Sequence, residues 1–321
     1  MTRLSHRTAA LAGLTALVSS VSFAGTVAPA NASEPVASRS ATCFDPADVG
    51  AGTGSAAAAR GGRSGADHRE LSAKERAAIE TRTKNILAAK GKPGGGGTTP
   101  TAGAGVPVYI HVMADANGNG DVTATQISQQ ITELNQDFAG GESTSAASTG
   151  FTFSLAGVDR YHNTQWHQDR SSTTYRSKTR LGGKNALNIW LVDFAYLGIA
   201  TFPWDYAKNP SIDGIRVNYT SLPGGSATNY NQGKTASHEA GHWLGLYHTF
   251  QGGCTSTNDE VSDTPAQAGA TSGCPEGRDS CSLPGLDPIH NYMDYSYDPC
   301  YNQFTPKQAT RTQQMFAAYR A

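Results

Sequence analysis

The stretch that most limits the fold of this 321-residue chain is HEAGHWLGLYH, at residues 238–248. His238 and His242 are four residues apart, so on a helix they share one face and can reach one ion at about 2.0–2.1 Å. His248 lies ten residues after His238, about 15 Å further along a straight helix. Gly245 resolves this, because glycine readily adopts the left-handed conformation that ends helices. The stretch therefore predicts a helix that ends near Gly245 and a chain that turns back to bring three imidazoles together.

Glu239 places an acid–base group beside these imidazoles. It points roughly 100° away from His238 around a helix axis, so it is not an equivalent ligand, but it can reach a water molecule on the ion's open side. Three histidine ligands and an open position are typical of catalytic zinc, whereas closed structural sites favour four protein ligands, often with cysteine. We predict zinc at His238, His242 and His248, with Glu239 as the general base and acid of a hydrolysis.

The first residues have the three-part pattern of a secretory signal peptide. Arg3 and Arg7 make a positive start, an apolar run follows at 9–18, and small residues surround Asn31. The alternative is a membrane anchor, but the run is far shorter than the roughly 20 residues that cross a bilayer. We therefore expect a signal peptide over 1–32 and a secreted protein with no membrane partner.

Residues 33–105 differ in composition from the rest of the chain. Ser/Ala-rich and Gly-rich stretches dominate, and 91–105 has the composition of a flexible linker. One helical segment interrupts them at 70–90, where Ser72 and Glu75 fit a capping box. We interpret 33–105 as a pro-segment with its linker; a disordered spacer fits the composition equally well.

The remaining residues, 106–321, form the predicted catalytic domain. Strand-like runs are at 106–113, 151–158, 186–193, 197–203 and 213–219. Capping boxes predict helices that begin after Thr123, with Gln126, and after Thr305, with Pro306 and Gln308. The run at 114–122 matches half of a calcium loop, but Gln126 stands where the loop needs glutamate, so we interpret it as a polar turn.

Charge and cysteine content narrow the class of protein further. The formal net charge is −1 and no Lys/Arg-rich run occurs, so we expect no nucleic-acid partner. Four of the five cysteines cluster in the last quarter of the chain, which favours two disulfide bridges in an exported protein, with three pairings open. These four are Cys254, Cys274, Cys281 and Cys300, and Cys43 stands alone upstream.

The chain from about Val106 to its C-terminus resembles the pappalysin family of metzincin zinc peptidases. The resemblance rests on the extended histidine motif and on NYMDY at 291–295. VSDTP at 261–265 and LGIATFP at 197–203 support it. It implies an α+β fold with an α/β-type upper half, a twisted mixed sheet and two long helices. An irregular, disulfide-linked lower half with the C-terminal helix would face it across a cleft.

The resemblance also implies roles for single residues. Met293 matches the methionine turn beneath the metal, where it would serve as an apolar floor. Tyr295 matches a tyrosine that can swing to the metal or the reacting carbonyl. The cysteine cluster matches bridges Cys254–Cys281 and Cys274–Cys300. Structural calcium is implied nearby, with candidate ligands Asp259, Asp263 and Thr264, which fit solvated loop residues equally well. Cys43 would be either a thiolate that caps the zinc in a latent form or a free or intermolecular cysteine.

The predicted substrate is a protein or peptide that lies extended along the strand at 197–203. Asp298 lies where metzincins build the pocket for the residue after the scissile bond, and an acidic wall would favour Arg or Lys there; a turn residue before Pro299 is the alternative. We expect a monomer. Two rival functions remain at this point: a secreted zinc-binding module without catalysis, and a zinc hydrolase with a non-peptide substrate.

Overall fold

The computed structural model describes residues 71–91 and 103–321. The predicted signal peptide at 1–32, Cys43 and most of the expected pro-segment lie outside the described residues. Within that segment, the predicted helix is present as α1, Ala73–Lys90, and its capping box of Ser72 and Glu75 is formed.

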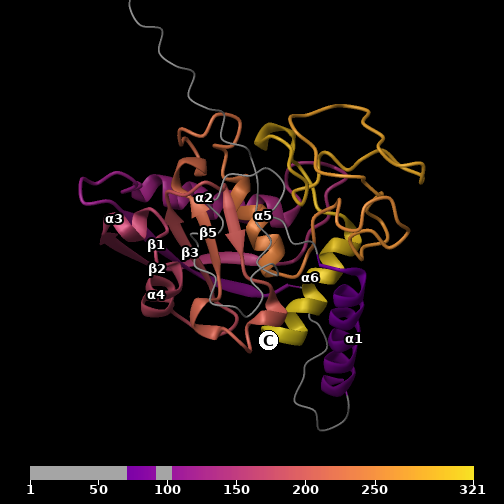
Figure 1. The fold of residues 1–321 in the computed structure, drawn as a ribbon, viewed down its shortest axis with the longest axis horizontal. Helices are drawn as coiled ribbons and strands as arrows, with labels where there is room; N and C mark the ends of the chain where they lie inside the picture. The colour runs from indigo at the N-terminus through magenta and orange to yellow at the C-terminus, as the bar shows by residue number, and fades with distance from the viewer. Residues whose placement is uncertain (1–70, 92–102) are drawn as a thin grey trace, which may run out of the picture. The chain divides into compact units, whose positions relative to one another are not determined.

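A five-stranded mixed sheet, with strand order β2-β1-β3-β5-β4, lies on the left of the domain in the view of Figure 1. Its strands are β1 Gly105–Ala114, β2 Thr152–His162, β3 Leu187–Val192, β4 Gly198–Ala200 and β5 Ile215–Asn218. The first four in this order pair in parallel, whereas β4 runs antiparallel to β5 at the edge. Every residue of β3 is buried, as the continuous apolar run predicts for a central parallel strand. The predicted twisted mixed sheet is therefore confirmed.

Helices α2, Ala124–Ala139, and α5, Lys234–Trp243, pack on one face of this sheet. The apolar stripe of α2, with Ile127, Leu134 and Phe138, meets the buried side of the strands and Trp243 of α5 in one core. Helices α3, Thr164–His167, and α4, Ser172–Thr179, adjoin a second cluster that includes Trp190 and Tyr175. Short 3-10 turns are at Pro203–Asp205, Pro210–Ile212, Tyr219–Ser221 and Asp298–Cys300.

Residues 249–305, all of them described, form neither an α-helix nor a strand beyond a single bridge between Asn291 and Gln303. Two disulfides cross-link this region, Cys254–Cys281 with Cα atoms 5.4 Å apart and Cys274–Cys300 with Cα atoms 5.6 Å apart. The pairing implied by the resemblance is confirmed, and so is the irregular lower half.

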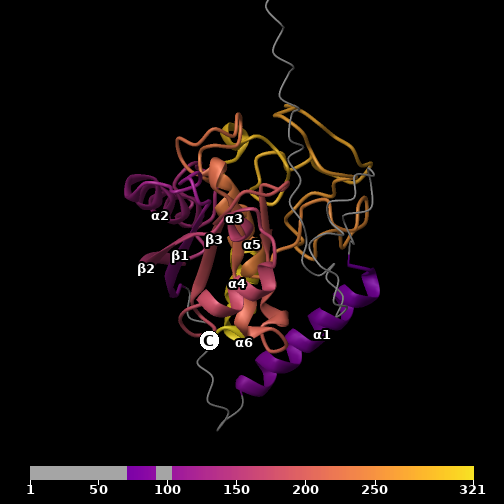
Figure 2. The same ribbon diagram turned by 60° about the vertical axis from the view of Figure 1, so that its left-hand side comes forward.

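The C-terminal helix α6, Pro306–Tyr319, follows the irregular region and begins with the predicted box of Thr305 and Gln308. Helix α1 lies alongside it (Figures 1 and 2). Leu71 is buried with Phe202 and Tyr247, and the Thr83 hydroxyl lies 2.9 Å from that of Tyr319. The predicted helical segment therefore docks on the domain.

The turn at 114–122 is organised by Asp115. Its carboxylate accepts hydrogen bonds from the main-chain N–H groups of Asn117 and Asn119, each at 2.8 Å, and from the Asn119 side chain at 2.7 Å. Such local bonds are those of an ordinary polar turn, as the sequence predicts. Across the described part of the chain, no helix is both long and apolar enough to traverse a bilayer.

Candidate active site

The side chains of His238, His242 and His248 converge on one point. The Nε2 atom of His242 lies 3.1 Å from that of His238 and 3.0 Å from that of His248, and all three side chains are buried. Nitrogens that bind one tetrahedral zinc at about 2.05 Å are about 3.3 Å apart. The three ring nitrogens thus have close to the spacing that a single zinc ion requires.

The other ring nitrogens fix how these imidazoles face. Nδ1 of His238 bonds the carbonyl of Tyr292 at 2.6 Å, and Nδ1 of His242 bonds the carbonyl of Leu246 at 2.8 Å. Because carbonyls only accept, each Nδ1 carries the proton and each Nε2 of the neutral ring presents a lone pair. Burial lowers the pKa of His238 to about 4 and lowers that of His242 well below its usual value, so both rings are neutral. Converging lone pairs in a buried site suit a bound cation.

Helix α5 ends where the sequence predicts. Gly245 has a φ of +96°, its N–H bonds the carbonyl of His242 at 2.8 Å, and the chain then turns so that His248 faces the helix. A β-carbon at this position would lie 2.5 Å from Cγ of Met315. Glycine is therefore required at this turn both by the backbone conformation and by the packing behind it.

Met293 lies beneath the histidines and is fully buried. A β-carbon added to Gly241 of α5 would lie 2.4 Å from its sulfur, so the helix presents bare backbone to the thioether. The N–H of Thr249 also bonds the Met293 carbonyl at 3.1 Å. These contacts fit the apolar floor predicted for Met293.

Glu239 is buried against the edge strand β4. A β-carbon on Gly198 would lie 2.3 Å from its Oε1 atom and 2.6 Å from its carboxyl carbon. Only glycine leaves room for the carboxylate there, so Gly198 sets the distance between this acid–base candidate and the strand at the sheet edge.

Tyr295 lies on the loop side of the histidine cluster. Its ring centroid is 4.8 Å from that of His248 and 5.8 Å from that of His238. Phe250 stacks on His248 at 4.8 Å and its ring centroid is 5.0 Å from that of Tyr295. The phenol is half-buried. The structure thus brings the tyrosine next to two of the three imidazoles.

The N-terminal end of α5 is anchored by a buried lysine that the sequence analysis did not single out. The Lys234 ammonium pairs with Asp137 at 2.7 Å, with Glu142 at 2.6 Å and with Glu133. The Ser237 hydroxyl also bonds Asp137. Four charged groups therefore join α5 to the chain around α2, four residues before the first histidine.

Two other clusters among the described residues contain side chains that can bind a metal, but these side chains already make other interactions. The three carboxylates around Lys234 already neutralise its ammonium. Cys274 and Cys300, near His290, are joined in a disulfide and offer no thiolate. The histidine cluster is therefore the candidate metal centre in this part of the chain.

A pocket opens beside His238, and Asp298 lines it. The Asp298 carboxylate accepts a hydrogen bond from the main-chain N–H of Gln232 at 2.8 Å, and burial raises its pKa to about 7. Asp298 also begins a 3-10 turn, so it lines the pocket and shapes the turn before Pro299. The pocket is lined by Leu197, Tyr230, Lys234, Thr235, His238, Tyr295, Ser296, Asp298 and Tyr301.

The three candidate calcium ligands have different surroundings. Asp263 accepts bonds from the Thr305 hydroxyl at 2.7 Å and the Lys307 N–H at 2.9 Å, so it caps the start of α6. Asp259 and Thr264 are buried, and the Thr264 hydroxyl adjoins the Asp259 carboxylate. Burial raises the pKa of Asp259. Adjacent buried oxygens suit a hard cation, which leaves Asp259 and Thr264 as the better pair.

Lys234, Gly198 and Gly241 are site residues that sequence reasoning missed. Each acts on a group far away in the chain: a carboxylate of α2, a glutamate 41 positions later and a methionine 52 positions later. Lys234 directly precedes TASHEAGH at 235–242, Gly241 lies within that stretch, and Gly198 lies within LGIATFP. The only local signal of a role for these three residues was a small or apolar neighbour in the sequence.

Comparison with known proteins agrees with this site. A family model described as pregnancy-associated plasma protein-A, a peptidase family, matches residues 193–317. An extracellular metalloprotease of Sordaria macrospora is 48% identical over 206 residues, which cover 62% of this chain and 70% of the relative. A relative from Neurospora crassa with the same description has the same identity and coverage. The names of these relatives agree with the export predicted here.

Solved structures give the same assignment. Mirolysin bound to a small compound has 31% identity and a TM-score of 0.61, over 68% of this chain and 92% of that chain. A promirolysin mutant of Tannerella forsythia has 28% identity and a TM-score of 0.64, over 77% of this chain and 89% of that chain. Together with the histidine cluster and the confirmed disulfides, these relatives show that the chain is a metalloendopeptidase of the pappalysin family, the family of pregnancy-associated plasma protein-A.

Proposed function

We propose that this protein is a secreted endopeptidase in which His238, His242 and His248 hold zinc and Glu239 is the general base. The observation that carries the proposal is the convergence of three Nε2 atoms, 3.0 and 3.1 Å apart, next to a buried carboxylate. Zinc at this position would act as a Lewis acid and make water nucleophilic near neutral pH. Three protein ligands leave a position for that chemistry, whereas a closed structural site would need a fourth.

Glu239 accepts the proton of the attacking water and later delivers it to the leaving amine. Its burial against Gly198 removes competing solvent from the carboxylate and fixes the side chain beside the edge strand. A carboxylate held in this way is positioned before the substrate arrives, which lowers the cost of reaching the reactive geometry.

Tyr295 stabilises the developing oxyanion in this proposal. Its ring packs on His238 and His248, which puts a phenol at the rim of the histidine cluster. A hydroxyl donor aimed at the charge that forms during attack is a frequent element of peptide hydrolysis. We therefore assign Tyr295 a catalytic role next to Glu239.

The substrate is a polypeptide in extended conformation. Strand β4 lies at the edge of the sheet, and its outer side can pair with another main chain. Gly198 of this strand touches Glu239, so a peptide paired along β4 would pass the catalytic base. Mature mirolysin of Tannerella forsythia, 31% identical, was solved with a cleaved peptide, which supports the same class of substrate here.

The pocket beside His238 selects a basic side chain after the scissile bond. Asp298 is the carboxylate that lines it, together with aromatic rings that accommodate an aliphatic stem. When ionised, this buried carboxylate attracts an Arg or Lys side chain more strongly than an exposed one would.

Structural calcium completes the proposal. We assign Asp259 and Thr264 as ligands because their oxygens are buried next to each other, and we leave out Asp263 because it caps α6. A cation there would stabilise the loops that follow the third histidine.

The test is a protein-cleavage assay with matched variants. Glu239→Gln should retain zinc by metal analysis and lose kcat/KM by about 10²- to 10⁴-fold. Glu276→Gln, a carboxylate 72% exposed, is the control and should retain the wild-type rate. Chelation should abolish activity and added zinc should restore it. A zinc-loaded Glu239→Gln enzyme with the wild-type rate would remove Glu239 from the mechanism, and a metal-independent wild-type rate would refute the proposed function.

A further inference from the structure

Two arginines of the C-terminal segment bind the end of the histidine-bearing helix. The Nε–H of Arg320 donates to the carbonyl of Trp243 at 2.9 Å, and the Nε–H of Arg311 donates to the carbonyl of Gly245, also at 2.9 Å. Carbonyls at a helix C-terminus have no partner within the helix, and cations are favoured there by the helix dipole. Helix α6 and its C-cap residue thus provide both caps to α5.

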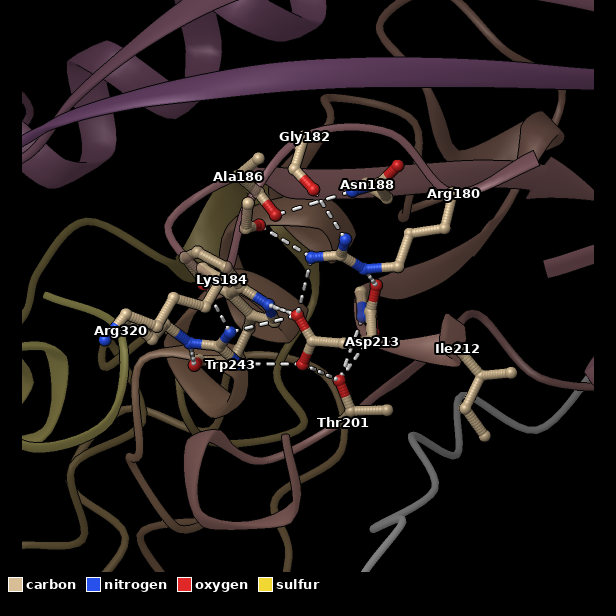
Figure 3. Close-up of polar contacts among 12 residues, drawn as sticks. Arg180, Gly182, Lys184, Ala186, Asn188, Thr201, Ile212, Asp213, Trp243 and Arg320 are labelled. Carbon is tan, nitrogen blue, oxygen red and sulfur yellow. Dashed lines mark hydrogen bonds and ion pairs between the residues drawn. The ribbon is translucent and has the colours of Figure 1, made fainter. Parts of the chain in front are cut away.

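The two guanidinium groups are held in the same way. Arg320 stacks on the Trp243 ring at 3.6 Å and pairs with the Asp213 carboxylate at 2.9 and 3.0 Å (Figure 3). Trp243 itself donates to Asp213 at 3.1 Å. Arg311 lies 4.9 Å from the Tyr247 ring centroid and bonds the carboxylate of Glu80 at 2.6 Å. In each case an aromatic ring, of the helix end or of the turn after it, supports the cation and a carboxylate orients it.

The turn between these carbonyls determines where the imidazoles lie. The Leu246 carbonyl, one residue after Gly245, accepts the Nδ1–H of His242, and His248 follows two residues later. A displacement of the Gly245–Leu246 peptide would therefore shift the adjoining Leu246 carbonyl, which orients one ligand, and the following chain, which bears another. Holding the Gly245 carbonyl restrains both.

The two carboxylates that orient the arginines come from different parts of the chain. Asp213 lies two residues before β5, within the sheet part of the domain. Glu80 belongs to α1 and is 231 residues away from Arg311. The same helix is fixed nearby by Arg76, which bonds Glu260 at 3.3 Å, and by the Leu71 carbonyl, which accepts from Gln251 at 3.3 Å. Helix α1 thus provides the carboxylate that holds the Arg311 guanidinium group.

We propose that Arg311 is a positioning residue of the histidine site and that Glu80 of helix α1 holds it in position. This rests on the proposed function, because it assigns a role toward the metal that His238, His242 and His248 would bind. Arg311 touches neither substrate nor metal; it acts through the Gly245 carbonyl and the turn. Removal of the Glu80 carboxylate leaves Arg311 with one anchor fewer, so the turn samples more conformations and the ligands converge less well.

The test compares two charged contacts between α1 and α6. Glu80→Gln removes the partner of Arg311. Lys90→Gln is the matched control, because Lys90 also reaches from α1 to α6, where it bonds the Ala317 carbonyl, away from the histidines. Arg311→Gln removes the positioning group itself. Each full chain is loaded with cobalt(II) for its absorption spectrum and titrated with zinc against a chelating indicator; urea unfolding measures the stability of each metal-free protein.

We expect zinc affinity to fall by about tenfold in Glu80→Gln and by 10- to 100-fold in Arg311→Gln, as for other residues that orient metal ligands indirectly. The cobalt spectrum should change in both, while Lys90→Gln keeps the wild-type spectrum and affinity. Wild-type spectrum and affinity in Glu80→Gln would overturn the proposal, even where Arg311→Gln fails to fold. An equal loss in Lys90→Gln would also overturn it, since α1 docking alone would then explain the effect. A wild-type protein that binds no metal would refute the proposed function itself.

Discussion

On the sheet side of the histidine cluster, all ten residues of α5 are buried, and the lysine at its start is surrounded by three carboxylates. On the loop side, residues 249–305 lack regular structure and are cross-linked by two disulfides. Two imidazoles come from the first side, while Met293 and Tyr295 come from the second and His248 lies between them. The site needs side chains held equally firmly on both sides, and each side achieves this by different interactions. The sheet side uses apolar burial and ion pairs, whereas the loop side uses disulfides and side-chain hydrogen bonds.

The largest effect should follow from breaking the ion cluster on the sheet side. Lys234→Met leaves three carboxylates without their cation, and removal of one partner from a buried charge pair costs about 3–5 kcal/mol. Urea unfolding should show that loss, whereas Lys178→Met, at an exposed position of α4, should leave the unfolding free energy unchanged. Equal stability of the two variants would mean that apolar burial alone holds α5.

The corresponding change on the loop side is removal of one disulfide. The bridge Cys254–Cys281 closes a separation of 27 residues, so replacing both cysteines by alanine should lower the unfolding free energy by about 2–4 kcal/mol. Cys274 and Cys300, 26 residues apart, should give a similar loss in a parallel double variant. If neither pair of substitutions shifts the urea midpoint, the comparison drawn here between covalent and ionic support is wrong.

A smaller, more local effect is expected where the edge strand β4 contacts Glu239. Gly198→Ala places a β-carbon 2.3 Å from Glu239, which must displace the carboxylate and lower kcat/KM by about 10²-fold. Gly269→Ala is the control, since a β-carbon there meets nothing within 4 Å. Steady-state kinetics with one peptide substrate measure both, and an unimpaired Gly198→Ala enzyme would show that the strand does not determine the position of Glu239.

The smallest effect should be a change of preference at the pocket. Because burial raises the pKa of Asp298 to about 7, the carboxylate ionises as pH rises through that value. The ratio of kcat/KM for substrates with Arg rather than Leu after the scissile bond should therefore rise from pH 6 to pH 8, by up to about tenfold. The ratio cancels titrations common to both substrates.

Asp298→Asn provides the control for that ratio, because asparagine does not titrate. We expect its ratio to be low and independent of pH. A wild-type ratio that stays flat, or a pH-dependent ratio in Asp298→Asn, would exclude Asp298 as the group that selects basic side chains.

How far the sequence predicts the structure depends on how far apart the interacting residues are along the chain. Capping boxes such as Thr123 with Gln126 span three residues, and they are correctly predicted. The glycine turn at Gly245 follows from the ten-residue spacing of two histidines. By contrast, the disulfide pairing came from the family resemblance, since four cysteines allow three pairings.

Contacts between distant segments were beyond the sequence pattern. Nothing near Glu80 indicates a partner at Arg311, and nothing near Gly198 indicates that a glutamate will lie against it. The cap on α5 likewise joins Arg320 to Trp243 across 77 residues. Residue type and spacing describe the local chain, whereas these groups meet only because the sheet, α5 and α6 pack together.

The docking of α1 has a consequence for how the enzyme can be processed. A cut before Leu71 would leave the helix attached to the domain that it contacts. A cut within 92–102 would instead turn Ala73–Lys90 into a separate peptide, held only by contacts such as those of Glu80 and Thr83. Such a two-chain enzyme would lose its helix on dilution, because the high local concentration of a tethered segment is then gone.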